Sequence, residues 1–235
     1  FSILSLIVCM TVRPVWHGSI FGPYFVLGSL YSGCGVLIVA MWVYRKMYKL
    51  ENYFTNKHFT NLGYGMMVLA AAYGYFTFSE YFTDWFGSAK WDSEVINKLF
   101  NPAEYGWWSL FANFVGILIP IFIVAIPKTR KPGWITLAAF FMVIALWVKR
   151  YLIIVPTLET PALPMQETRI EYIKYNATWP EWALTFAGIA SFLLFFTIMS
   201  KFVTVVPVSG LEEPEHEHNH HHEHLPATNE NVQPA

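Results

Sequence analysis

Long apolar runs separated by short polar segments dominate this 235-residue chain. Each run is close to the roughly 20 residues that an α-helix needs to cross a bilayer. The pattern therefore predicts an all-α fold, a polytopic transmembrane helical bundle that occupies residues 14–208. The five predicted full spans cover residues 20–44, 62–84, 105–126, 134–156 and 180–206.

The two ends of the chain differ from the predicted bundle. Residues 1–13 start with a largely apolar stretch that is too short to span and lacks the basic region of a signal peptide. We interpret them as the end of a truncated helix, one partial helix before the five spans. Residues 209–235 are rich in Glu and His and cannot bury a core, so we expect a disordered tail. Its six histidines could bind metal ions weakly, but a solvated tail is the favoured interpretation and no metal site is predicted.

Composition supports membrane insertion and excludes several other classes. Only 13% of the residues are charged and the mean hydropathy is +0.38, whereas a soluble domain carries about twice that charge. A net charge of −1 gives no reason to expect a nucleic-acid partner. Cys9 and Cys34 are the two cysteines, and neither lies in a CxxC or CxxCH motif. We therefore expect no iron–sulfur cluster and no c-type haem held by this chain.

Charge in the loops predicts the orientation. The loop after the first span and the loop after the third span are basic, whereas the other two are acidic or balanced. Because cytoplasmic loops carry excess Lys and Arg, we expect the basic loops and the C-terminal tail on the cytoplasmic side of a bacterial inner membrane. His17 and residues 85–104 and 157–179 would then face the opposite side. The basic residues are Arg45, Lys46, Lys49, Lys57, Lys128, Arg130 and Lys131.

The start of the first full span combines a histidine with a Gly-Pro pair. His17 follows Trp16, and Tyr24 lies two turns further on, just past Gly22 and Pro23. Polar groups at the mouth of a span are costly unless they have a role. Imidazole can accept a proton near neutral pH, so His17 is a candidate base. The alternative is that His17 only caps the helix entrance by hydrogen bonding.

Opposite charges are predicted at similar depth in two spans. At 1.5 Å per residue, Glu80 lies about 6 Å and Arg150 about 9 Å below the outer ends of their helices. A lone buried charge is expensive, so we expect the two to pair. Asp84 shares a helix face with Glu80. A structural clamp and a step in a proton route are both consistent with this cluster. Lys149 points about 100° away from Arg150 and is expected to extend toward the membrane surface.

Five segments, in order along the chain, together resemble a known family. They begin with Trp-His-Gly-Ser-Ile-Phe-Gly-Pro-Tyr-Phe at residues 16–25 and end with Ala-Thr-Trp-Pro-Glu-Trp at 177–182. The resemblance is to the polysulfide-reductase membrane subunit family (NrfD/PsrC type), close to the quinol-oxidising membrane subunits of alternative complex III. It covers residues 11–210, and the chain resembles the C-terminal portion of such a subunit. The other three segments are residues 75–87, 113–120 and 149–158.

The resemblance implies quinone chemistry in a respiratory electron-transport complex. Such subunits bind quinol near the outer face and pass its electrons to an iron–sulfur partner, and some couple this to proton translocation. It implies a quinone cofactor, menaquinone or ubiquinone, with other membrane subunits as partners. Trp16, His17 and Tyr24 are then the expected quinol-binding residues. The expected catalytic residues are His17, Glu80, Asp84 and Arg150.

Two other classes of function remain open from the sequence. Intramembrane charges and Gly or Pro at the mouths of spans also fit a transporter or channel subunit, although the five spans show no internal inverted repeat. A purely structural membrane anchor for peripheral redox subunits is the other alternative. In the quinol-based interpretation, the chain is a subunit of an oxidoreductase complex rather than an enzyme alone.

Overall fold

In the computed structural model, every regular element of the described residues is a helix. The all-α prediction is therefore confirmed for this part of the chain. The protein divides into two compact units, Phe1–Tyr175 and Asn176–Ala235, which we describe separately. The described residues are 3, 6–7, 16, 18, 20–51, 53–87, 90–160, 175 and 177–202. Most of the predicted truncated helix, His17 and the whole histidine-rich tail lie outside them.

Four helical segments are long and apolar enough to cross a membrane: α2, the continuous α5–η1–α6 segment, α7 and α8. They coincide with four of the five predicted spans. The remaining prediction, residues 62–84, lies within α3, which has the length but is not among these four. The elements are α2 (Phe21–Met47), α3 (Asn56–Gly87), α4 (Lys90–Phe100), α5 (Gly106–Asn113), the π-helix η1 (Phe114–Leu118), α6 (Ile119–Ala125), α7 (Pro132–Leu158) and α8 (Trp179–Phe202).

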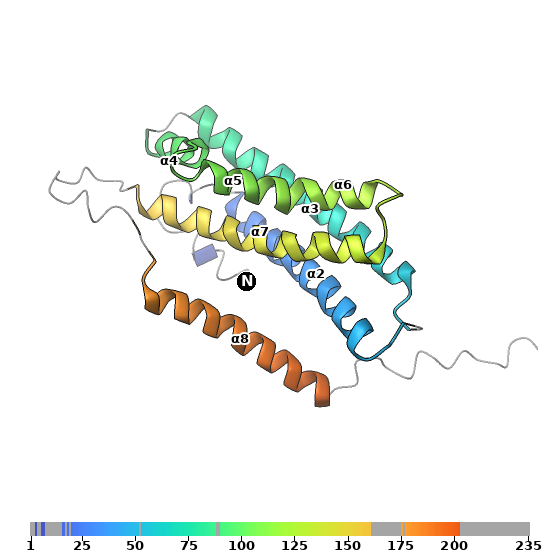
Figure 1. Cartoon of the computed structure of the whole chain (residues 1–235). Helices are drawn as coiled ribbons and strands as arrows, with labels where there is room; N and C mark the ends of the chain where they lie inside the picture. The colour runs from blue at the N-terminus through green and yellow to red at the C-terminus, as the bar shows by residue number, and fades with distance from the viewer. Residues whose placement is uncertain are drawn as a thin grey trace, which may run out of the picture. The chain divides into compact units, whose positions relative to one another are not determined.

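The core of the first unit forms where α2, α3, α7 and the η1–α6 segment pack side by side (Figure 1). On α2, the buried residues Tyr24, Tyr31 and Ile38 recur every seven residues. This spacing keeps one stripe of a helix facing its neighbours. The other faces carry exposed apolar side chains, such as Leu37 and Phe122, which suits a surface in contact with lipid. Further core residues are Phe59, Met66, Ala70, Tyr73, Ile117, Val124, Ile135, Ala139, Met142 and Leu146.

Two glycines allow the helices to approach closely. A Cβ atom added at Gly35 of α2 would lie 2.4 Å from the Met142 methyl carbon on α7. One added at Gly74 of α3 would lie 2.9 Å from Ile117 in η1. Membrane helices use small residues in this way because the backbones can then pack tightly.

The π-helical turn η1 accompanies a proline. Pro120 has no N–H, and a proline ring collides with the carbonyl four residues earlier, here that of Gly116. The helix widens into η1 over this stretch. The buried Tyr31 hydroxyl on α2 donates a hydrogen bond to the Gly116 carbonyl oxygen at 2.6 Å. The Tyr31 side chain thus supplies the Gly116 carbonyl with a hydrogen bond that Pro120 cannot donate.

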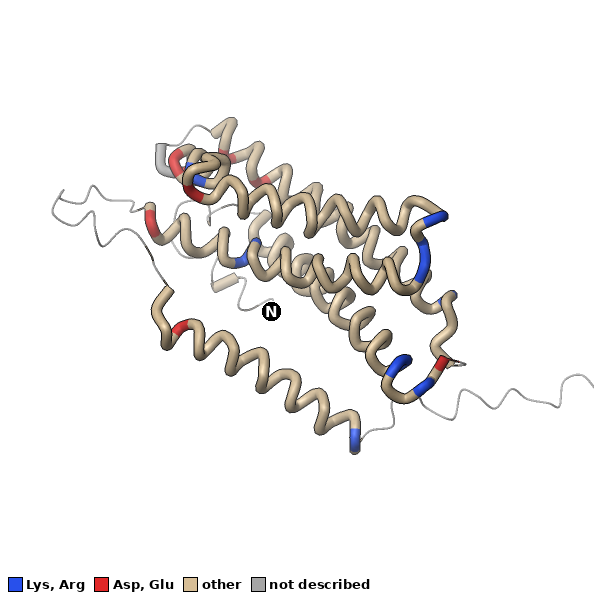
Figure 2. The backbone as a smooth tube through the Cα atoms, viewed as in Figure 1, with Lys and Arg blue, Asp and Glu red and all other residues tan. Residues whose placement is uncertain are grey.

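Charged residues gather at the two ends of the first unit (Figure 2). The basic residues after α2 and those between α6 and α7 lie at the same end, as the sequence predicted for one side of the membrane. The other end carries most of the acidic residues and α4, a helix that the sequence analysis treated as loop. Val95 and Leu99 of α4 pack on Val148 and Leu152 of α7, which explains why so short a helix is stable here.

The second unit contains α8. None of the 24 residues of α8 is buried, and the surface of this helix is largely apolar from Trp182 to Met199. A helix that is hydrophobic all round is typical of a membrane span.

Candidate functional site

Of the predicted quinol-binding residues, the structure describes Trp16 and Tyr24. Trp16 stacks on Phe21 with ring centroids 6.2 Å apart. Its indole N–H donates to the Ile153 carbonyl at 3.3 Å. Trp16 therefore joins the entrance of α2 to α7, in the last turn before Pro156. His17 follows it in the chain and stays a prediction.

Tyr24 belongs to a buried cluster of hydroxyl groups. It is 1% exposed, and its ring stacks on that of Tyr73, with centroids 4.8 Å apart. The Tyr24 hydroxyl donates to the Tyr73 hydroxyl at 3.0 Å and lies 3.2 Å from Thr77 Oγ1. Thr77 donates in turn to the Tyr73 backbone carbonyl at 2.9 Å. Because each hydroxyl can both donate and accept, the three side chains form a connected hydrogen-bond network.

Lys149 forms a second polar cluster closer to the end of α7. It is 3% exposed, so the expectation that it extends toward the membrane surface is wrong. Its ammonium group donates to the Tyr81 hydroxyl and, at 3.0 Å, to Asn113 Oδ1. It also lies 4.5 Å from the centroid of the Tyr81 ring. Partners on α3 and α5 therefore hold this charge inside the bundle.

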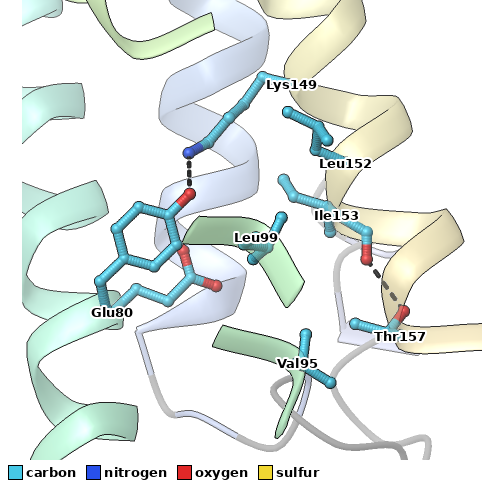
Figure 3. A pocket seen from close by; sticks show the side chains of 8 residues that line it. Glu80, Val95, Leu99, Lys149, Leu152, Ile153 and Thr157 are labelled. Atoms are coloured by element: carbon cyan, nitrogen blue, oxygen red, sulfur yellow. Dashed lines mark hydrogen bonds between the residues drawn. The ribbon is translucent and has the colours of Figure 1, made fainter. Parts of the chain in front are cut away.

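Glu80 lies in the same region. A cavity of about 20 Å³ is lined by Glu80, Tyr81, Lys149 and Thr157, together with apolar side chains from α4 and α7. Figure 3 shows Lys149 and Thr157 on α7 and Glu80 on the facing helix α3, with the Lys149 side chain extending from α7 toward α3. This volume is enough for one water molecule and far too small for a quinone ring.

The other two predicted catalytic residues are partly buried near the same end of the unit. Asp84 lies one turn after Glu80 on α3, and its negative charge acts on Glu80. The Arg150 guanidinium lies 5.5 Å from the centroid of the Phe25 ring, a distance at which a cation is attracted by the ring face. The pairing of Glu80 with Arg150 stays a prediction.

Polar residues form a line along one side of α3. Tyr73, Thr77, Tyr81 and Glu80 follow each other at helical spacing and lead to Asp84. From Tyr73 to Asp84 the rise is about 16 Å at 1.5 Å per residue. Of these residues, only Glu80 and Asp84 were predicted from the sequence as site residues. The recurrence of hydroxyl residues every four positions was the signal for the others.

A groove on the outside of α2 is much larger than the cavity beside Lys149. Its volume is about 430 Å³, within the range of small-molecule sites. The lining is apolar and includes Gly22, Pro23, Val26, Leu30 and Phe76. Within the described part of the chain, no three His, Cys, Asp or Glu side chains could hold a metal ion together.

Together these features define a multi-pass membrane protein in which buried hydroxyl and ammonium groups and half-buried carboxyl groups lead toward one end of an apolar bundle. The chain belongs to the polysulphide reductase NrfD family, whose model matches residues 4–162. This confirms the family resemblance. A similar protein is the Hdr-like menaquinol oxidoreductase integral membrane subunit of Archaeoglobus fulgidus, which is 26% identical over 212 residues. The match covers 86% of this chain and 53% of that protein, so the chain spans about half the length of this curated relative.

Proposed function

We propose that the chain is part of an integral membrane subunit of a quinol-dependent redox complex. It would bind quinol near the outer face and contribute to passing the electrons to an iron–sulfur partner subunit, within a complex that includes further membrane subunits. Membership of the NrfD family and the relative's name support this function, and the latter favours menaquinol. The observation that carries it is the line of buried and half-buried polar groups from Tyr24 to Asp84, because quinol oxidation releases protons that need a path out of an apolar bundle.

In this proposal the groove on α2 is the part of the chain that fits a quinone. Its size and apolar lining suit a ring or an isoprenoid tail. When bound, the quinone supplies the two-electron redox chemistry. Trp16, His17 and Tyr24 lie within a few residues of the groove residues Gly22 and Pro23 in the sequence.

Each predicted residue has a proposed role in moving the proton. His17 accepts it at the membrane surface, as imidazole can near neutral pH. Glu80 and Asp84 carry it toward water. Arg150 balances their negative charge, because uncompensated charges inside a membrane are costly. Such a path would allow quinol oxidation to be coupled to proton translocation in a respiratory chain.

We further propose that α3 is a fifth span and that the basic loops and the C-terminal tail face the cytoplasm of a bacterial cell. With 32 residues, α3 is about 48 Å long, enough to cross a bilayer. Single cysteines at Lys57, in the first turn of α3, and at Ser93, on α4, test this topology. A membrane-impermeant maleimide should label them from opposite sides. Labelling of both from one side would contradict the arrangement.

His17→Ala in the complete complex tests the function. We expect menaquinol oxidation to slow by about 10²-fold, the lower range for loss of a positioned base, while the complex still assembles. His58→Ala is the matched control, since His58 lies on an exposed position in the first turn of α3 and should leave turnover unchanged. Equal turnover in both assembled variants would assign His17 a structural role only.

A further inference from the structure

The hydrogen bonds of Lys149 leave room for one more partner. A lysine ammonium group has three N–H donors. Two of them reach the Tyr81 hydroxyl and Asn113 Oδ1, which are the Lys149 partners within the described part of the chain. The Tyr81 hydroxyl oxygen accepts one of these bonds. Its own O–H is therefore available to donate to another acceptor.

The cavity beside Lys149 has the size and the lining that a water molecule needs. Its volume of about 20 Å³ exceeds the roughly 10–15 Å³ required for one water. A buried water also needs two to four polar partners. Lys149 and Tyr81 offer donors, and Glu80 offers carboxylate oxygens. The Thr157 hydroxyl donates to the carbonyls of its own helix, so its oxygen can accept.

A carboxylate, a phenol hydroxyl and an ammonium group meet at this cavity, from Glu80, Tyr81 and Lys149. Lys149 lines the cavity together with Glu80, and Asp84 lies one turn after Glu80 on α3. Asn113 on α5 and Tyr81 on α3 accept hydrogen bonds from the Lys149 ammonium group and hold it in place. Val95 and Leu99 of α4 and Leu152 of α7 form the apolar part of the cavity lining.

We propose that Glu80, Tyr81, Lys149 and Thr157 form a hydrated proton-exchange site that holds one water molecule in this cavity. Lys149 lies at the cavity with Glu80 and is held there by Tyr81 and Asn113. In the exchange step, an O–H bond of the protonated water breaks while an O–H bond forms on Glu80, and the reverse step releases the proton. No electrons move. That the proton comes from quinol is the one part that rests on the proposed function.

Infrared difference spectroscopy of the whole complex in lipid nanodiscs tests this site without quinol. Spectra are recorded while the buffer pH is switched, in H₂¹⁶O and in H₂¹⁸O. We expect one O–H band that shifts with the water isotope and one carboxylic-acid C=O band. Glu80→Gln should remove both bands and Lys149→Met should remove the water band. Lys131→Met, the same change on an exposed residue just before α7, should keep both.

A second measurement keeps the test decisive if the Lys149 variant assembles poorly. Lys149→Met leaves the Glu80 carboxylate without this cation, so we expect the yield of assembled complex to fall at least about tenfold. Adding Glu80→Gln should restore most of it, because the carboxylate that Lys149 faced is then neutral. A double variant no better than Lys149→Met, or a water band that survives in that variant, would overturn the site.

The outcomes separate this inference from the proposed function. A wild-type complex that shows the water band but oxidises no menaquinol supports the proton-exchange site and refutes the quinol function. A complex that oxidises menaquinol but shows no isotope-sensitive water band refutes the site alone.

Discussion

Removal of the Tyr31 hydroxyl tests how the π-helical turn is held. Tyr31 is fully buried, and its hydroxyl donates to the Gly116 carbonyl at 2.6 Å. Four residues after Gly116, Pro120 has no N–H to offer that oxygen. In Tyr31→Phe the ring stays in place, but the Gly116 carbonyl loses the bond that α2 supplies.

The expected cost follows from the surroundings of that carbonyl. A buried polar group left without a hydrogen bond costs about 1–3 kcal/mol. Measured side-chain hydrogen bonds between membrane helices average about 0.6 kcal/mol, with a maximum near 1.7. Because Gly116 is buried at the contact between η1 and α7, we expect about 1–2 kcal/mol. This corresponds to a factor of roughly 5–30 in the unfolding equilibrium constant.

Reversible unfolding in mixed micelles, followed by circular dichroism, measures this change. Tyr75→Phe is the matched control, because Tyr75 on α3 is 66% exposed. It should change the free energy of unfolding by less than about 0.5 kcal/mol. Adding Pro120→Ala to Tyr31→Phe restores a backbone N–H beside the carbonyl and should recover part of the loss. If Tyr31→Phe is no less stable than Tyr75→Phe, the assigned role of the Tyr31 hydroxyl is wrong.

Two further predictions concern packing and charge. Gly35→Leu should destabilise the first unit by about 1–3 kcal/mol through overpacking. Gly33→Leu should be close to neutral in the same unfolding assay, because a Cβ added there meets no atom within 4 Å. Equal effects of the two changes would refute the close contact of α2 with α7. If Glu80 pairs with Arg150, the variants Glu80→Gln and Arg150→Met should show a coupling of about 0.5–3 kcal/mol in a double-mutant cycle, and strictly additive costs would speak against the pair.

The sequence predicted the helices better than the contacts between them. Hydropathy placed the spans at 134–156 and 105–126, close to the observed Pro132–Leu158 and Gly106–Ala125, because an apolar run of this length has few alternatives in a membrane protein. The short helix α4 was missed. It is only 11 residues long and depends on packing against α7, which local sequence does not reveal.

In the candidate site, too, single residues were predicted from the sequence, whereas the contacts between helices were not. Glu80 was predicted as a site residue because a carboxylate inside an apolar run is costly, and Tyr24 was predicted from its position after His17 and from the family resemblance. The position of Lys149 was predicted wrongly, since its direction about 100° away from Arg150 suggested a side chain that extends toward the membrane surface. The residues that hold it in the bundle, Tyr81 and Asn113, come from two other helices. Only the packing of these helices brings the three side chains together.

Binding of a menaquinone analogue to the purified complex in nanodiscs tests the central claim most directly. The proposed function predicts saturable binding, at one analogue per copy of this subunit, that excess menaquinol displaces. Binding no greater than that of empty nanodiscs with the same lipids would contradict the assignment of a quinol site to the complex.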